Sequence, residues 1–263
     1  MQRATGERAE DAAPLRGRVG LITGASSGIG RATAVALGQR GMRLTLTARR
    51  RERLEEVAAA VERAGGQALV VPADARAEPE LRAVFARSDA RWGRLDVLVN
   101  AAGLGLPGGF LDPDPAAAAR AWRAMWEVNV LALCVATSEA LRRFDPVRGG
   151  HVVHIASMAA HRVPPGGGFY AATKHAVRAL TEALRQELRE ANSPSRVTAI
   201  SPGYVATEFF EVYYGEAERA HQILGRFRVL EPEDVARQVV HVLEQPPHVE
   251  IHDVLLRPTP QPT

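Results

Sequence analysis

A tyrosine and a lysine four residues apart, Tyr170 and Lys174, are suited by type and spacing to move a proton. Positions i and i+4 of a helix lie on one face, so the lysine ammonium can approach the phenol. Lys174 is the only lysine among the 33 Lys and Arg residues, and its compact ammonium fits where the planar fork of arginine does not. Such a pair can exchange a proton with a reacting oxygen. On its own, the pair is also consistent with a surface lysine beside an unrelated tyrosine.

A glycine-rich turn near the start of the chain could hold a phosphate. The apolar run Val19–Thr23 is followed by Gly24, Gly28 and Gly30, and an alanine-rich helical stretch begins at Arg31. Glycine permits positive φ angles and close approach, so backbone N–H groups and a helix N-terminus can meet a pyrophosphate. A strand before the turn and a helix after it are the context that a dinucleotide-binding turn requires.

Apolar runs typical of strands alternate with helical patterns along the chain. The predicted strands are Val19–Thr23, Leu44–Thr47, Ala68–Val71, Leu95–Val99, His151–Ile155, Arg196–Ile200 and Val254–Leu256. The predicted helices are Arg31–Arg40, Arg51–Ala64, Pro79–Arg91, Pro115–Arg143, Tyr170–Ala191 and Pro232–Glu244. This alternation predicts a single-domain, doubly wound α/β fold over residues 17–263, with a seven-stranded parallel sheet covered by helices on both faces.

The residues that could do chemistry fall at the carboxyl ends of these predicted strands. The glycine turn follows the first strand, Arg49 the second, Asp74 the third, Asn100 the fourth and Ser157 the fifth. In a doubly wound sheet the ligand lies beyond this edge. We therefore expect one site there.

In these motifs and their order, the chain resembles the short-chain dehydrogenase/reductase family. The matching elements are Thr23-Gly-Ala-Ser-Ser-Gly-Ile-Gly30, Asp74, Asn100-Ala-Ala-Gly103, Asn129, Ser157, Tyr170-x-x-x-Lys174, and Pro202-Gly203 followed by Thr207. They span Arg18 to Arg257, nearly the whole chain. A narrower likeness, in His161-Arg-Val163, Leu184–Arg189 and Leu256–Thr259, is to the branch that contains clavulanic-acid dehydrogenase, bacterial serine and 3-hydroxy acid dehydrogenases, and member-11 carbonyl (ketosteroid) reductases.

The resemblance implies that a hydride moves between a nicotinamide and a carbonyl or secondary alcohol. Tyr170 would supply the proton, and Ser157 would hydrogen-bond the substrate oxygen. Lys174 would hold the ribose hydroxyls and, with the oxidised nicotinamide ring, lower the pKa of the phenol. Moving that pKa from about 10 to about 7 requires roughly 4 kcal/mol, which one cation about 4 Å away supplies at an effective dielectric near 20. Asn129 would hold a water that relays protons to Lys174, and a structural role in a helix kink is compatible with this.

The cofactor contacts that the resemblance implies lie on the glycine turn, the strand ends and the segment after Pro202. They are Gly24, Ser26, Ser27, Gly28, Ile29, Gly30, Arg49, Arg50, Asp74, Ala75, Asn100, Ala101, Gly103, Tyr170, Lys174, Pro202, Gly203, Val205 and Thr207. Asp74 would accept a hydrogen bond from the adenine amino group.

The residues after the second strand favour NADP(H) over NAD(H). An NAD site usually places an acidic residue at the end of this strand, whereas here Ala48 is followed by three arginines. A guanidinium can bind a 2′-phosphate that a carboxylate would repel, with Arg49 as the leading contact and Arg50 as the second. The same arginines could merely begin the next helix and pair with its acidic residues.

The segment after Pro202-Gly203 carries six of the chain's eleven Phe and Tyr residues: Tyr204, Phe209, Phe210, Tyr213, Tyr214 and Phe227. In the family this segment, at about residues 203–230, covers the substrate, and an aromatic lid favours an apolar or cyclic ketone or aldehyde. The rings could equally form a subunit interface. His161 and Arg162 could instead meet a carboxylate, as in a serine or 3-hydroxy acid dehydrogenase. A non-catalytic NADP-binding sensor is a third possibility, which the intact Asn129, Ser157, Tyr170 and Lys174 disfavour.

Composition and charge argue against a nucleic-acid-binding, metal-binding, secreted or membrane-spanning protein. The 263 residues are 46% hydrophobic, the formal net charge is +3, and the arginines are interleaved with acids, so we expect no nucleic-acid partner. The eight histidines lack metal-ligand spacing, and the single Cys134 is predicted to be a small buried residue. Residues 1–16 are predicted to be a disordered extension without a secretory signal, and no apolar run reaches the ~18 residues of a membrane span. We expect a cytoplasmic protein with a small-molecule substrate, and the resemblance implies a homo-oligomer, a tetramer or a dimer.

Overall fold

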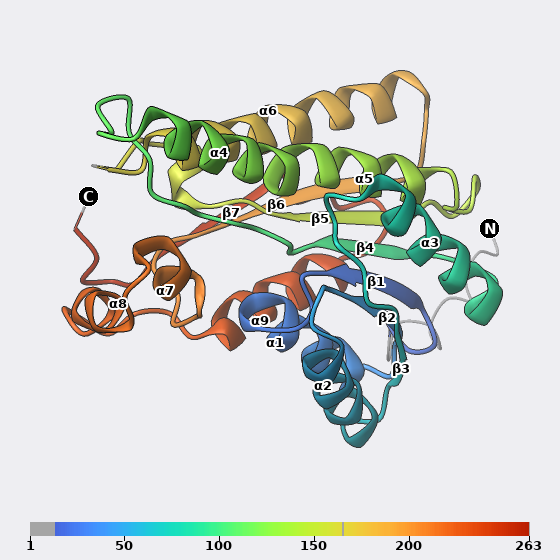
Figure 1. Ribbon diagram of the computed structural model, residues 1–263. Coiled ribbons are helices and arrows are strands. Elements are labelled where there is room, and N and C mark those ends of the chain that lie inside the picture. The colour runs from blue at the N-terminus through green and yellow to red at the C-terminus, as the bar shows by residue number, and fades with distance from the viewer. Residues whose placement is uncertain (1–13, 165, 263) are drawn as a thin grey trace, which may run out of the picture.

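The predicted doubly wound sheet is confirmed in the computed structural model, which describes residues 14–164 and 166–262. Seven parallel strands lie in the order β3-β2-β1-β4-β5-β6-β7 (Figure 1). They are β1 Val19–Thr23, β2 Arg43–Thr47, β3 Gln67–Val70, β4 Val97–Asn100, β5 His151–Ile155, β6 Arg196–Pro202 and β7 Asp253–Leu256. The order reverses between β1 and β4, and this switch point is where such a sheet opens a crevice.

Helices cover both faces of the sheet because its strands are apolar on both sides. On one face lie α1 (Gly28–Gly38), α2 (Arg51–Arg63) and α9 (Pro232–Leu243), and on the other α3 (Glu78–Trp92), α4 (Pro115–Trp126), α5 (Ala132–Leu141) and α6 (Gly168–Glu190) (Figure 1). The side chain of Ile22 packs with the first group, and that of Leu21 packs with the second. This alternation is the period of two expected of a strand buried on both faces.

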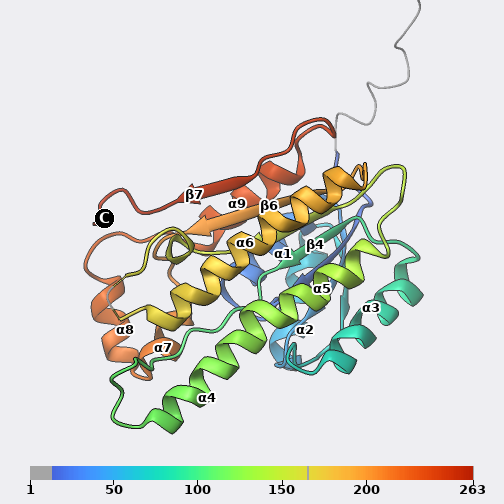
Figure 2. The ribbon, with the colours of Figure 1, turned by 90° about the horizontal axis from the view of Figure 1, so that it is seen from above.

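Two helices were not predicted: α7 (Phe209–Tyr214) and α8 (Ala217–Leu224). They lie beyond the carboxyl ends of the strands, apart from the helices that cover the sheet (Figures 1 and 2). Six and eight residues are too few for the repeated apolar pattern on which the sequence prediction depended. The aromatic segment is therefore helical rather than an irregular lid.

The single helix predicted over Pro115–Arg143 contains a π-helical turn, Glu127–Leu131, between α4 and α5. Its length and composition, over Pro115–Leu141, would allow it to cross a membrane, but half of its most apolar window is buried inside the fold. In Figure 2 it runs beside α6 over the sheet. A buried core helix passes the same test, so this feature is weak evidence for a membrane.

Of the predicted N-terminal extension, residues 1–13 lie outside the described residues. Leu15, which the prediction placed in the extension, is 1% exposed and packs in the core below the sheet. The Gly17 N–H also donates to the Gly41 carbonyl at 2.9 Å. The packed domain therefore begins before residue 17.

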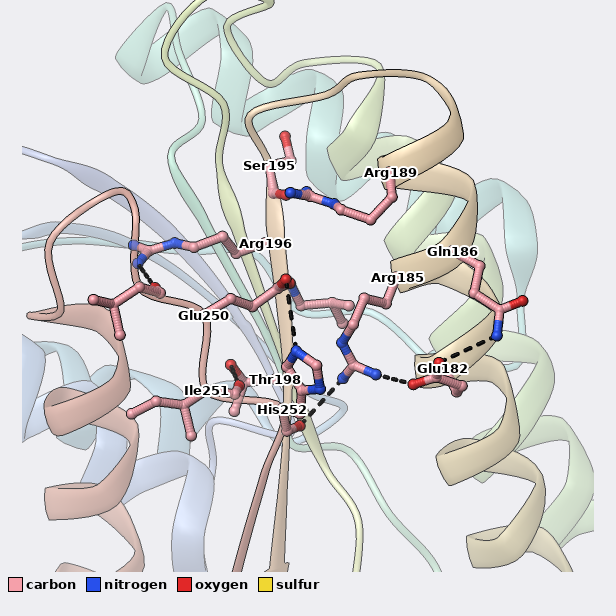
Figure 3. Close-up of polar contacts among 12 residues, drawn as sticks. Glu182, Arg185, Gln186, Arg189, Ser195, Arg196, Thr198, Glu250, Ile251 and His252 are labelled. Carbon is pink, nitrogen blue, oxygen red and sulfur yellow. Dashed lines mark hydrogen bonds and ion pairs between the residues drawn. The ribbon is translucent and has the colours of Figure 1, made fainter.

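At the amino ends of the strands, buried arginines join the C-terminal half of α6 to the segment before β7 (Figure 3). Arg185 pairs with Glu182 and donates to the His252 carbonyl at 3.4 Å. Arg196, at the start of β6, donates to the carbonyls of three residues after α9, with a shortest distance of 2.6 Å to Val249. These contacts tie α6, β6 and the segment before β7 together, although Arg185 Nε is buried without a partner among the described residues, and we assign this end of the sheet a structural role.

Candidate active site

A cavity of about 520 Å³ opens at the carboxyl ends of the strands. All but two of the predicted site residues line it: Gly24, Ser26, Ser27, Gly28, Ile29, Gly30, Arg49, Arg50, Asp74, Ala75, Ala101, Gly103, Ser157, Tyr170, Lys174, Pro202, Gly203, Val205 and Thr207. Asn100 and Asn129 do not line it. The edge of the sheet thus brings together residues that are far apart in sequence.

The turn after β1 has no room for a side chain at Gly24 or Gly30. An ideal Cβ on Gly24, whose φ is 67°, would lie 2.6 Å from the Ala102 nitrogen, and one on Gly30 would lie 2.3 Å from the Gly24 oxygen. Ser27, the N-cap of α1, makes no side-chain capping hydrogen bond. The first N–H groups of α1 therefore face a glycine-walled turn without a capping oxygen. This arrangement fits a pyrophosphate group.

The three arginines after β2 have different surroundings. Among the described residues, Arg49 makes no hydrogen bond or ion pair and is exposed in the cavity wall. Arg50 Nη2 lies 2.9 Å from Glu208 Oε2 and 3.4 Å from Ser26 Oγ. Arg51 begins α2 and lies 3.7 Å from Glu55. Arg51 therefore matches the alternative interpretation, because it begins α2 and pairs with an acidic residue of that helix. The Arg49 guanidinium, in contrast, can bind an anionic ligand.

Asp74 already has a cationic partner in the structure. Arg76 donates to both of its carboxylate oxygens, with a shortest distance of 2.6 Å, and this pairing holds the pKa of Asp74 below its usual value. An adenine amino group at Asp74 would therefore share the carboxylate with Arg76. The sequence prediction did not include Arg76, which also lines the cavity.

Tyr170 and Lys174 lie one turn apart on α6, and Ser157 follows β5. Lys174 is 5% exposed, and its Nζ donates to the Ile155 carbonyl at 2.9 Å. Nζ lies 5.8 Å from the centre of the Tyr170 ring. The predicted proximity of the two side chains is present, and Nζ retains donors for a second partner.

Burial has the largest effect on the pKa of the Tyr170 phenol in this structure. Burial raises the pKa of Tyr170 to about 12, and the hydrogen bond with Ser157 only partly opposes this. Burial also lowers the pKa of Lys174 to about 8. The phenol is therefore held protonated. The lowered phenol pKa that we predicted also required the positive ring of the oxidised cofactor, so it stays a prediction.

Asn129 lies within the π-helical turn, as a structural role in a kink would require. Its Oδ1 accepts from the Leu104 N–H at 2.7 Å, and its Nδ2 donates to the Leu104 carbonyl at 2.8 Å and to Thr173 Oγ1 at 3.0 Å. Both amide donors are thus used by the protein, so the carboxamide fixes the loop after β4 against α6. The water relay stays a prediction.

Asn100 does not reach the cofactor side of the cavity, contrary to our expectation. Its Nδ2 donates to Thr137 Oγ1 on α5 at 3.1 Å. That hydroxyl contacts His154 Nε2, and His154 Nδ1 contacts Thr181 Oγ1. Burial lowers the pKa of His154 to about 3, so this internal chain is neutral. The side chains of Asn100 and Leu98 lie two residues apart along β4, so both point to the face of the sheet that α5 covers.

Aromatic residues of α7 and its flanks cover the cavity. The Phe209 ring lies 5.2 Å from that of Tyr170, and Tyr213 donates to the Gly166 carbonyl at 2.6 Å. An ideal Cβ on Gly105 would lie 2.4 Å from the Phe209 ring, so this glycine is needed for the close seating of the lid. Five of the six predicted aromatic residues line the cavity, namely Tyr204, Phe209, Phe210, Tyr213 and Tyr214, and Phe227 stacks on Tyr204.

The two residues proposed to meet a carboxylate behave differently. His161 Nε2 lies 3.1 Å from Ser201 Oγ and 3.2 Å from Asp253 Oδ2, and His161 does not line the cavity. Arg162 does line it, and its Nη2 donates to the Pro262 carbonyl at 3.2 Å. The expectation for His161 is therefore wrong because β6 and β7 supply its partners.

Comparison with known proteins gives concordant matches. A family model described as short chain dehydrogenase matches residues 18–216. Dehydrogenase/reductase SDR family member 11 of Bos taurus is 43% identical over 255 residues, covering 94% of this chain and 98% of the relative. A closed form of serine dehydrogenase complexed with NADP+ superposes with a TM-score of 0.85 at 32% identity, covering 93% of this chain and 96% of that chain. A short-chain dehydrogenase/reductase from Burkholderia phymatum in complex with NAD has a TM-score of 0.81 at 25% identity, with coverages of 92% and 89%.

Proposed function

This chain belongs to the short-chain dehydrogenase family, and from that membership we propose that it is an NADP(H)-dependent reductase of apolar or cyclic ketones and aldehydes. Members of this family are oxidoreductases that act on alcohol or carbonyl groups with a nicotinamide cofactor. The single observation that carries the proposal is the meeting of Ser157, Tyr170 and Lys174 in one cavity with the glycine-walled turn.

When bound, a nicotinamide cofactor supplies the hydride for the carbonyl carbon in reduction and accepts it in oxidation. Tyr170 completes the reduction by giving its hydroxyl proton to the carbonyl oxygen, since a phenol is protonated at neutral pH. Ser157 hydrogen-bonds the same oxygen and stabilises its developing charge. Lys174 has N–H groups beyond the one on Ile155 with which to hold ribose hydroxyls.

The preference for NADP(H) rests on Arg49. Its guanidinium stands at the cavity wall without a partner among the described residues, and no acidic side chain ends β2. A 2′-phosphate would give it one. The solved relatives do not decide the matter, since one is complexed with NADP+ and another with NAD.

The substrate class rests on the lid. Five aromatic side chains of the lid line the cavity in addition to Tyr170, which favours an apolar or cyclic carbonyl compound. A hydroxy acid is the second candidate, because Arg162 lines the same cavity and could pair with a carboxylate. A non-catalytic sensor would have no use for the arrangement of Ser157 and Tyr170.

The test is a measurement of NADPH oxidation by the purified protein with cyclic ketones, aldehydes, linear ketones and keto acids, with NADH in parallel. We expect turnover of an apolar ketone or aldehyde with NADPH. Faster turnover of keto acids would favour the hydroxy-acid assignment. Tight NADPH binding without turnover of any compound would favour the sensor.

A further inference from the structure

The residues after β7 fold back over the cavity and place a glutamine, Gln261, in its wall. The Gly203 N–H donates to the Leu256 carbonyl at 2.8 Å, and a turn closes where the Gln261 N–H donates to the Pro258 carbonyl at 3.0 Å. Gln261 is only 6% exposed and lines the same cavity as Ser157. A carboxamide buried this deeply needs partners for its polar atoms.

The oxygen of this carboxamide has a hydrogen-bond partner within the fold. The Tyr204 N–H donates to Gln261 Oε1 at 3.1 Å. Oε1 also lies against Gly203, where an ideal Cβ would come within 2.3 Å of it. Because a backbone N–H can only donate, the contact identifies this end of the side chain as the oxygen and fixes where the nitrogen lies.

The other end lacks a strong partner. Gln261 Nε2 carries two N–H donors, and the structure gives it one contact, 3.5 Å from Met158 Sδ. A thioether is a weak acceptor, so at least one N–H of this buried amide has no oxygen to bind among the described residues. Met158 lines the cavity and directly follows Ser157, the residue expected to hold the reacting oxygen.

The neighbouring polar groups are already engaged. The imidazole of His161 is held by Ser201 and Asp253, and the Tyr213 hydroxyl is bound to Gly166. Arg162 also lines the wall, with one N–H on the tail itself at Pro262. Besides the tyrosine hydroxyls and that of Ser157, Gln261 Nε2 is therefore a neutral donor of this wall to which the described residues offer no oxygen.

We propose that Gln261 is a specificity-determining residue, whose Nε2 donates to a second acceptor oxygen of the substrate, near the carbonyl that is reduced. The inference rests on the proposed reductase function and narrows its substrates to ketones with an additional carbonyl, hydroxyl or carboxylate oxygen. An apolar ketone without this oxygen leaves the buried N–H unpaired in the complex, which lowers its kcat/KM.

The experiment compares diketones with matched monoketones. Diacetyl, acetylacetone and acetonylacetone place the second carbonyl at three increasing distances, and each is paired with the methyl ketone that has a methylene there instead. The measured quantity is the ratio of kcat/KM for the diketone to that for its monoketone, because intrinsic reactivity cancels when this ratio is compared between enzyme variants.

Two variants separate the donor from the docking of the tail. Gln261→Glu keeps an acceptor for the Tyr204 N–H but loses the N–H donors when ionised, whereas Gln261→Met loses both. Gln186→Met is the matched control, since Gln186 is an exposed glutamine on α6 that contacts Glu182 at the amino ends of the strands (Figure 3). The melting temperature of each variant reports whether the fold and the tail are intact.

We expect the ratio to fall about three- to tenfold in both Gln261 variants for at least one spacing, the effect of losing one neutral hydrogen bond. It should stay unchanged in Gln186→Met. An unchanged ratio in Gln261→Glu at every spacing, while wild type reduces the ketones, overturns this inference alone. Levulinate, a keto acid, tests whether the second oxygen can be that of a carboxylate. If wild type prefers levulinate, and Arg162→Gln removes this preference while the Gln261 variants keep it, the result also counts against Gln261. If wild type reduces cyclic ketones or aldehydes but none of these diketones, this inference fails alone. If it reduces no carbonyl compound at all, the proposed function itself fails.

Discussion

Replacing Arg49 by alanine tests the proposed preference for NADPH over NADH, because Arg49 is the residue expected to bind the 2′-phosphate. Four arginines line the cavity: Arg49, Arg50, Arg76 and Arg162. Among the described residues, Arg50 is paired with Glu208, Arg76 with Asp74 and Arg162 with a tail carbonyl. Only the guanidinium of Arg49 is without a partner there, so it has most to gain from a 2′-phosphate and its loss disturbs no contact of the fold.

The size of the effect follows from the kind of bond. A hydrogen bond to a charged group contributes roughly 1.5–3 kcal/mol, and about 1.4 kcal/mol corresponds to a tenfold change. Arg49→Ala should therefore raise the Kd for NADPH about ten- to a hundredfold. The Kd for NADH should hardly change, because NADH has no 2′-phosphate. Since Arg49 is exposed, the loss should shrink as salt is added.

The assay is a fluorescence titration of both cofactors into wild type and three single variants. Arg50→Ala should have a smaller effect than Arg49→Ala, because Arg50 already shares its charge with Glu208. Arg51→Ala is the matched control, since Arg51 is an exposed arginine that pairs with Glu55 along α2. Equal weakening of NADPH and NADH by Arg49→Ala, or an equal effect of Arg51→Ala on NADPH, would refute the assignment of Arg49 to the 2′-phosphate.

Three further predictions concern the proton donor, the lysine and the assembly. Tyr170→Phe should lower kcat at least a hundredfold, the lower range for a lost general acid, while NADPH titration shows binding within about twofold of wild type; retained turnover would exclude Tyr170 as the donor. The pKa of Lys174 is lowered from 10.5 to about 8 in the folded protein, so the unfolded chain binds the extra proton between these values. The free energy of unfolding of wild type, measured in urea, should therefore rise from pH 8 to pH 10 relative to that of Lys174→Met. Parallel pH profiles of the two proteins would show that burial does not lower the pKa of Lys174. We also propose a homo-oligomer, for which the exposed Trp126 and Leu131 on the α4–α5 helix offer apolar surface, and a monomer mass by light scattering at micromolar concentration would contradict it.

Much of the fold follows from local sequence. The strands were placed to within two residues at each end because continuous apolar runs between turns mark buried parallel strands. The glycine turn was recognisable because only glycine fits where an ideal Cβ at Gly30 would touch the Gly24 oxygen. Tyr170 and Lys174 were found from their i and i+4 spacing, and Ser157 from its place in the family pattern. The strand order of the structure then brings their segments to one edge of the sheet.

The remainder depends on contacts between distant segments. The π-helical turn is accompanied by hydrogen bonds from Asn129 to Leu104, a partner that helical periodicity cannot reveal. The direction of Asn100 follows from the alternation of β4 and shows only once α5 covers that face. Gln261 carried no signal in the sequence, because its role arises from a tail that folds back across Gly203. The raised pKa of Tyr170 reflects burial, which a pairwise estimate from its spacing to Lys174 omits.

The choice of arginine at every basic position but one has a consequence for covalent labelling. Amines attack activated esters and aldehydes, whereas arginine stays charged and unreactive under the same conditions. The only side-chain amine here, that of Lys174, is 5% exposed at the floor of the cavity. A dye or resin coupled to a side-chain amine would have to react inside the active site. The labelling yield at Lys174, measured by mass spectrometry with and without cofactor, would then report site occupancy, and tethering that leaves the cavity untouched has to use a group other than a lysine amine.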